Sequence, residues 1–163
     1  MRRVLLILPL AAIAVTSVIL TNRAQLAAST AAPPTAGFTI HIDAEKHFGN
    51  AHPKEIAHHY CKQLPDMIEC QIYDSDAPTA HLVEVETILS PSAYKALPAS
   101  EKALWHYHRT EIPKVNAKII GMSAADQKKL VAKLLPTYGK VWMLWDPQAT
   151  KQPAGQPTVI VLK

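Results

Sequence analysis

Cysteine, glycine and charged residues are scarce in this 163-residue chain. It has two Cys, five Gly and 18% charged residues, against 48% hydrophobic residues. This composition excludes a collagen-like chain, a polar disordered tail and a protein with several membrane spans. Because thirteen Pro accompany only five Gly, irregular connections are favoured over a tight all-β barrel. The length supplies one hydrophobic core rather than two large domains.

Acidic residues are absent before Asp43, and this accounts for most of the formal net charge of +4. Removing Arg2, Arg3 and Arg23 from the seventeen Lys and Arg leaves fourteen, against thirteen Asp and Glu. A nucleic-acid partner needs a concentrated basic face, and the rest of the chain has none. We therefore expect no nucleic-acid partner.

The N-terminal segment has the pattern of a targeting sequence. Two Arg precede the apolar run 4–20, which suits either a cleaved signal peptide or an uncleaved membrane anchor within residues 1–28. Residues 29–36 are interpreted as a flexible spacer and residues 37–163 as a single domain. Both alternatives predict an exported protein of the periplasm or cell envelope. An uncleaved anchor would tether it to the inner membrane and would be its only membrane contact.

Two apolar and aromatic runs, 56–64 and 68–73, flank Pro65 and Asp66. An antiparallel hairpin centred there places Lys62 opposite Glu69 and Cys61 opposite Cys70. Proline cannot take the positive φ of a type I′ turn, so we expect a wider loop over residues 64–67. A helix starting at Pro53 is the alternative, because the apolar residues also fit helical spacing.

The remaining pattern indicates both strands and short helices. Alternation over 81–89 predicts a strand, and further strands are expected near 37–42, 141–145 and 158–161. Ser90 and Pro91 mark the start of a short helix, and a second helix is expected over about 100–106. Ser123 begins a third, which Pro136 ends. The predicted class is α+β: a mainly antiparallel sheet with two to three short helices packed on it.

Histidine is dense in this chain, with eight residues. Neutral imidazole binds zinc and other transition metals, and a carboxylate can orient such a ligand from outside. The predicted ligands of a transition metal ion such as zinc are His47, His58, His59, His106 and His108, with Glu86 and Glu111 as outer partners. No fixed-spacing zinc motif is present, so the alternative is that these His only bond local backbone and aromatic neighbours.

Cys61 and Cys70 are the only thiols. Directly opposite positions of an antiparallel pair are close enough for a disulfide, which persists in an oxidising compartment. A pair of buried thiols and metal ligation are the alternatives. Without a C-x-x-C pair, a redox-active thiol is not expected.

Six segments together resemble the plant oil body-associated protein family: residues 47–48 (HF), 58–62 (HHYCK), 69–76 (ECQIYDSD), 85–86 (VE), 101–108 (EKALWHYH) and 137–142 (TYGKVW). The resemblance extends over residues 37–163. The bacterial and fungal relatives of this family are grouped as a domain of unknown function. It implies association with lipid droplets in seeds and implies neither a catalytic activity nor a cofactor.

The function predicted from these patterns is a binding or structural module with a His-lined pocket for a metal or small ligand. A metal-dependent enzyme, either a hydrolase or an oxygenase, is the alternative, with Glu86 or Glu111 as base. A third class is a protein that binds a lipid surface, by analogy with the plant branch alone. No catalytic residue is assigned.

Overall fold

The computed structural model describes residues 32–46 and 55–161. Contacts divide the chain into two units, residues 1–36 and residues 37–163. In the first unit the described residues form a turn, closed by the Ala36 amide donating to the Pro33 carbonyl. All the strands and helices described below belong to the second unit.

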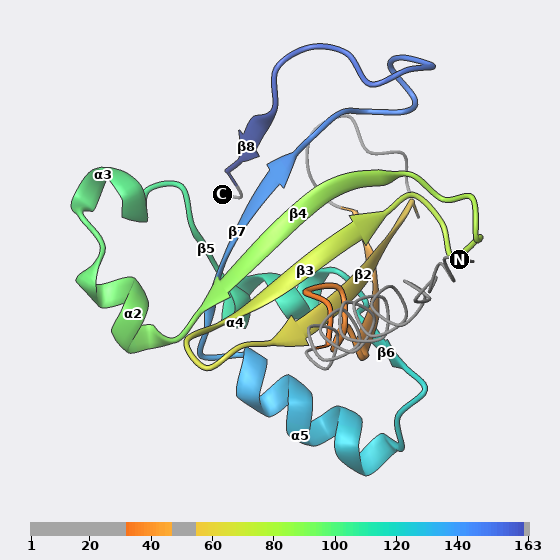
Figure 1. Ribbon diagram of the computed structural model, residues 1–163. Helices are drawn as coiled ribbons and strands as arrows, with labels where there is room; N and C mark the ends of the chain where they lie inside the picture. Colours follow the sequence, from red (N-terminus) through yellow and green to blue (C-terminus); the bar gives the residue numbers. More distant parts are fainter. Residues whose placement is uncertain (1–31, 47–54, 162–163) are drawn as a thin grey trace, which may run out of the picture. The chain divides into compact units, whose positions relative to one another are not determined.

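An antiparallel sheet of eight strands forms the second unit (Figure 1). Its order is β5-β7-β4-β3-β2-β1-β6, with β8 paired to β7. The strands are β1 Ile40–Glu45, β2 Ile56–Gln63, β3 Met67–Tyr73, β4 Leu82–Leu89, β5 His106–Tyr107, β6 Lys118–Ile120, β7 Tyr138–Met143 and β8 Thr158–Ile160. The chain therefore builds the sheet centre from neighbouring hairpins and adds the later strands at its two edges.

The hairpin predicted around Pro65 is confirmed. Cys61 lies opposite Cys70 and Lys62 opposite Glu69, and the Leu64 amide donates to the Met67 carbonyl across the loop. The alternative of a helix over this stretch is wrong, because residues 56–63 are strand β2. Cys61 and Cys70 form a disulfide.

The helices are shorter and more numerous than predicted. The described residues contain α2 Pro91–Ala96, α3 Ala99–Lys102, α4 His108–Glu111, the 3-10 helix η1 Ile112–Lys114 and α5 Ala124–Leu134. The hydroxyls of Ser90 and Ser123 cap α2 and α5 as expected from the sequence. The helix expected over 100–106 ends at Lys102, because residues 106–107 pair with β7 as a strand. The α+β class is confirmed.

The two faces of the sheet differ in what covers them. Side chains of α4, η1, α5 and β6 converge with strand residues on one face, and Figure 1 shows α4 lying across the sheet. The buried apolar cluster on this face consists of Ala57, Cys61, Cys70, Ile72, Ile88, Leu134, Val141 and Ile160. Because side chains alternate along a strand, the intervening residues lie on the opposite face.

No helix among the described residues combines the length and the apolar composition needed to span a bilayer.

We predict that the disulfide contributes about 2–3 kcal/mol to the free energy of unfolding, by restricting the unfolded chain. The measurement is urea unfolding of the oxidised protein, of the same protein with reductant, and of the Cys61→Ala/Cys70→Ala variant. Reduced wild type is the matched comparison, since it keeps both sulfur atoms, and reductant should leave the double variant unchanged. Equal stability of oxidised and reduced wild type would contradict the prediction.

Candidate functional site

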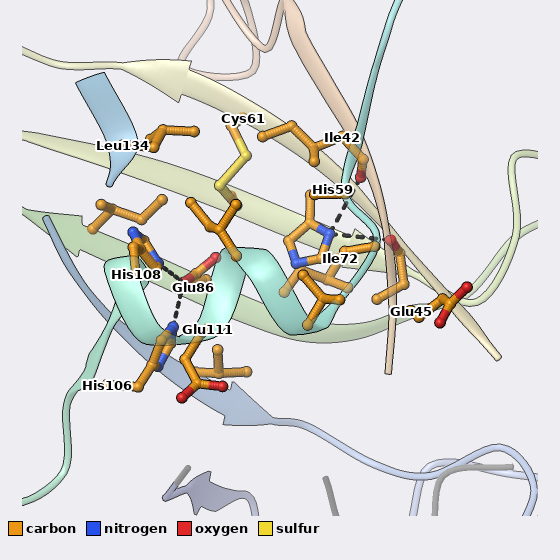
Figure 2. Close-up of a pocket in the computed structure, with 18 of the residues that line it drawn as sticks. Ile42, Glu45, His59, Cys61, Ile72, Glu86, His106, His108, Glu111 and Leu134 are labelled. Carbon is orange, nitrogen blue, oxygen red and sulfur yellow. Dashed lines mark hydrogen bonds and ion pairs between the residues drawn. A yellow bond between two sulfur atoms is a disulfide. The ribbon is translucent and has the colours of Figure 1, made fainter. Parts of the chain in front are cut away.

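A cavity of about 110 Å³ lies between the sheet and the segments that cover it (Figure 2). Most of its wall is aliphatic and includes the Cys61–Cys70 disulfide. Eight ionisable side chains interrupt this apolar wall: Glu45, Lys46, His59, Glu84, Glu86, His106, His108 and Glu111. Charged groups in an apolar wall are costly unless they are paired, so each of them needs a physical explanation.

Glu86, His106 and His108 form a buried polar group in this wall, each 6–7% exposed. Glu86 comes from the middle of β4, His106 from β5, and His108 from the first position of α4. Nε2 of His108 lies 3.3 Å, and Nε2 of His106 3.4 Å, from the same oxygen, Oε1 of Glu86 (Figure 2). Three ligand atoms therefore meet within 4.8 Å of one another.

Gly139 provides the space for this group. It pairs with His106 across β5 and β7, and it lies on the strand that also pairs with β4. A Cβ at this position would collide with Oε1 of Glu86 and with Nε2 of His106. The close approach of the carboxylate and the imidazole therefore depends on the missing side chain of Gly139.

A chain of hydrogen bonds fixes the tautomer of His108. The Thr137 hydroxyl donates its single hydrogen to the Leu134 carbonyl, at 2.6 Å. It must therefore accept the hydrogen bond from Nδ1 of His108, at 2.8 Å, so Nδ1 carries a hydrogen. When this ring is neutral, its Nε2 has a lone pair directed at Glu86.

The Glu86 carboxyl remains ionised in this position. Burial alone would raise its pKa, but hydrogen bonds with His106 and His108 outweigh burial and lower it well below the ordinary value. Nδ1 of His106 is buried and has no hydrogen-bond partner among the described residues. The polar contact of the His106 ring is therefore made through Nε2, toward Glu86.

His59 lies in the same wall and is also fixed in one orientation. Its Nδ1 contacts the carbonyl oxygens of Ala57 and Ile42, at 3.1 and 3.3 Å, so Nδ1 is the donor and Nε2 carries the lone pair. Burial lowers the pKa of His59, which keeps the ring neutral. His59 is not among the atoms that converge on Glu86.

Glu84 and Lys46 form a separate ion pair at the cavity wall. Nζ of Lys46 lies 3.6 Å from Oε1 of Glu84 and 2.7 Å from Oε1 of Glu55. Burial of Glu84 raises its pKa to about 7, and the neighbouring Lys46 offsets only part of this effect. The pKa of Lys46 is raised: burial acts to lower it, but the hydrogen bond to Glu55 and the charge of Glu84 outweigh burial.

The structure brings together some of the residues predicted as ligands and separates others. His106 and His108 converge, and Glu86, predicted as an outer partner, is in direct contact with both. His59 and Glu111 line the same cavity without joining that contact. His58 does not join this group, because its ring contacts Asp43 and Asp76 on the other face of the sheet. His47 lies outside the described residues.

Sequence reasoning did not identify Thr137, Gly139 or Lys46 as parts of the site, and it gave Glu84 only as one of several available acids. Glu84 gave a usable signal, because it shares one face of a predicted strand with Glu86 and Ile88, where acids are unexpected. Thr137 and Gly139 gave none by themselves. Their roles depend on pairing between β5 and β7, and residue 106 was expected in a helix.

The fold and this site define an α+β protein with a buried group of two imidazoles and one carboxylate beside an apolar cavity. The chain belongs to the family described as "Protein of unknown function (DUF1264)", which matches residues 32–162. No solved structure matches the chain significantly.

Named relatives come from two plants. The chain is 35% identical to Oil body-associated protein 2B of Zea mays over 112 residues, which cover 68% of this chain and 45% of that protein. It is 36% identical to Oil body-associated protein 1B of Arabidopsis thaliana over 107 residues, covering 64% and 44%. Identity to Oil body-associated protein 2A of Arabidopsis thaliana is 28% over 134 residues, covering 78% and 53%. The chain thus matches about half the length of these relatives.

These relatives confirm the resemblance to oil body-associated proteins and correct the expected location. A protein of the periplasm or cell envelope was predicted from the N-terminal pattern. That prediction is contradicted, because the relatives are plant proteins named for association with oil bodies. The segment on which it was based, residues 1–28, lies outside the described residues.

We predict that Glu84 destabilises the folded protein as the pH rises. Its pKa is about 7 when folded and near the ordinary 4.5 when unfolded, so the unfolded chain ionises first. The free energy of unfolding therefore falls by about 3 kcal/mol on account of this group as the pH rises from below 4.5 to about 7. In Glu84→Gln this loss should be absent, and urea unfolding at pH 5 and pH 8 measures it. An unchanged pH dependence in the variant would refute the assignment.

We predict that Gly139→Ala destabilises the protein by about 1–3 kcal/mol, because the added methyl group forces Glu86 and His106 apart. Thermal unfolding at neutral pH measures the loss. The control is Thr87→Ala on the neighbouring strand β4, at the position that pairs with Lys140 of β7. A Gly139→Ala variant as stable as wild type would show that the space is not needed.

Proposed function

We propose that this chain is a metal-binding protein and that Glu86, His106 and His108 hold one transition metal ion, with zinc the best fit. The observation that carries the proposal is the convergence of acceptor atoms on one point. Because Nδ1 of His108 donates to Thr137, Nε2 of a neutral His108 has only a lone pair to offer Oε1 of Glu86. Two acceptors 3.3 Å apart repel each other unless a cation lies between them.

The spacing of these atoms supports a tetrahedral ion. Ligands about 2.0–2.1 Å from a tetrahedral zinc ion lie about 3.3–3.4 Å from one another. Nε2 of His108 and Nε2 of His106 lie 3.3 and 3.4 Å from Oε1 of Glu86. The separation of each imidazole nitrogen from the carboxylate oxygen therefore matches that of two ligands of one zinc ion, and all three atoms lie within 4.8 Å of one another.

The surroundings of the three residues also support metal binding. Metal-ligating His residues commonly donate their second ring nitrogen to a fixed oxygen, as His108 donates to Thr137. The apolar wall around the group limits access of water and so strengthens its interaction with a cation. These features favour a ligand set that is organised before the ion binds.

Three protein ligands leave one tetrahedral position for another group. Zinc sites with three protein ligands use the fourth for water or a bound molecule. The cavity beside the group is lined by aliphatic side chains and by the Nε2-presenting ring of His59. A small ligand with one polar group and an apolar body fits this environment. The proposed role is thus a binding module for a metal and a small ligand.

We predict that the full chain, dialysed against zinc and then against buffer, retains zinc, and that Glu86→Gln and His106→Ala each lose one equivalent. Both substitutions remove one ligand, and Glu86→Gln keeps the shape of the side chain. Metal content by mass spectrometry and zinc affinity by titration are the measurements. His81→Ala is the matched control, because His81 is an exposed imidazole bonded to Asp74.

The alternative occupant of the same position is a proton on His108, which would form an ion pair with Glu86. In that case wild type and Glu86→Gln would retain equal amounts of zinc, and adding EDTA would leave the melting temperature of wild type unchanged. Either result would overturn the proposal. Circular dichroism of each variant shows whether the fold is retained.

A further inference from the structure

A second group of imidazoles and carboxylates lies on the other face of the same sheet. His41 and Asp43 on β1 lie opposite Tyr60 and His58 on β2, so all four side chains share one face. Asp76, from the loop between β3 and β4, reaches the same place. Alternation along β2 puts His58 here and its neighbour His59 in the cavity.

Four atoms of this group form a closed ring in which nitrogen and oxygen alternate. Nε2 of His41 lies 3.1 Å from Oδ1 of Asp43 and 3.1 Å from Oδ1 of Asp76. Nδ1 of His58 lies 2.9 and 3.1 Å from the same two oxygens. Each nitrogen thus lies within 3.1 Å of two carboxylate oxygens, and each of the two oxygens faces two imidazoles, but only the contacts with Asp43 have hydrogen-bond geometry.

The N–H group of each imidazole points at Oδ1 of Asp43, so it does not account for the second contact of each ring, 3.1 Å from Oδ1 of Asp76. A cation at the centre of the ring would contact all four atoms at once. Each of them is a metal-ligating atom, and all four lie within 4.8 Å of one another. A common ligand would account for all four contacts, whereas hydrogen bonds account only for the two with Asp43.

Contacts outside the ring hold two of its members in place. The ring of His41 stacks on Tyr60, with centroids 4.4 Å apart and planes 14° from parallel. The Tyr60 hydroxyl donates to Oδ1 of Asp76 at 2.8 Å, which raises the pKa of Tyr60 to about 12. Partners of this kind orient the ligands of metal sites. Asp76 is 45% exposed, so an ion can enter from solvent.

We propose that His41, Asp43, His58 and Asp76 bind a divalent copper ion. The sides of the ring are 2.9–3.1 Å, shorter than the separation of about 3.3–3.4 Å that tetrahedral zinc requires. A donor set of two nitrogens and two oxygens that alternate around a ring suits the tetragonal coordination typical of Cu²⁺. Cu²⁺ is also the divalent first-row ion that such ligands bind most tightly.

The copper site and the proposed zinc site share no residue and lie on opposite faces of the sheet, so they can be tested separately. The experiment uses the full chain carrying Glu86→Gln, stripped of metal and titrated with Cu²⁺. We expect one tight equivalent, with an axial electron paramagnetic resonance spectrum that shows coupling to two nitrogens. In this background, His58→Ala and Asp76→Asn should each weaken copper binding by more than about 10-fold.

Asp76→Asn keeps the size of a half-exposed loop side chain, so we expect this variant to fold as its parent does. The control is His81→Ala, which removes an exposed imidazole beside a different carboxylate, Asp74, and should leave the copper spectrum unchanged. A copper spectrum that is the same in His58→Ala and Asp76→Asn as in their parent would overturn the proposal. The absence of a stoichiometric copper signal in the parent would also overturn it.

Discussion

The register between β2 and β3 is the constraint on which the rest of the structure depends. Side chains alternate between faces, so a slip of one residue would exchange every inward group with an outward one. The Cys61–Cys70 disulfide joins directly opposite residues and allows only this register. With the register fixed, His59 faces the cavity and His58 faces the opposite side. The two adjacent imidazoles therefore have different surroundings.

Burial of two acids on β4 is a second constraint on the structure. Glu84 and Glu86 occupy alternate positions of β4 and face the same cavity, yet the pKa of Glu84 is raised and that of Glu86 is lowered. Two imidazoles within 3.4 Å of Glu86 outweigh the effect of burial, whereas Lys46, 3.6 Å from Glu84, does not. Partner number and distance, rather than burial, distinguish the two carboxyls.

The sequence predicted those parts of the fold that depend on local pattern. The hairpin, the strand over 81–89 and the capped helix α5 follow from alternation, turn residues and N-cap residues. The segment from 103 to 120 was not predictable in the same way. It is divided among short elements whose conformation is set by pairing with β7 and β1 rather than by local preference. His106 and His108 lie in that segment. The sequence therefore predicted both residues as ligands but did not predict their direct contact with Glu86.

The same alternation that made the strands predictable explains why the histidines predicted as one group of ligands lie on two faces of the sheet. Along β2 a cluster in sequence is divided between two faces, and each half joins residues that are distant in sequence. His58 joins His41 and Asp43 through the pairing of β1 with β2, and His59 joins the wall that contains Glu86. A sheet with one face covered and the other accessible to solvent can thus offer two different ligand environments. The covered side suits an ion held in an apolar cavity, and the accessible side suits an ion that exchanges with solvent.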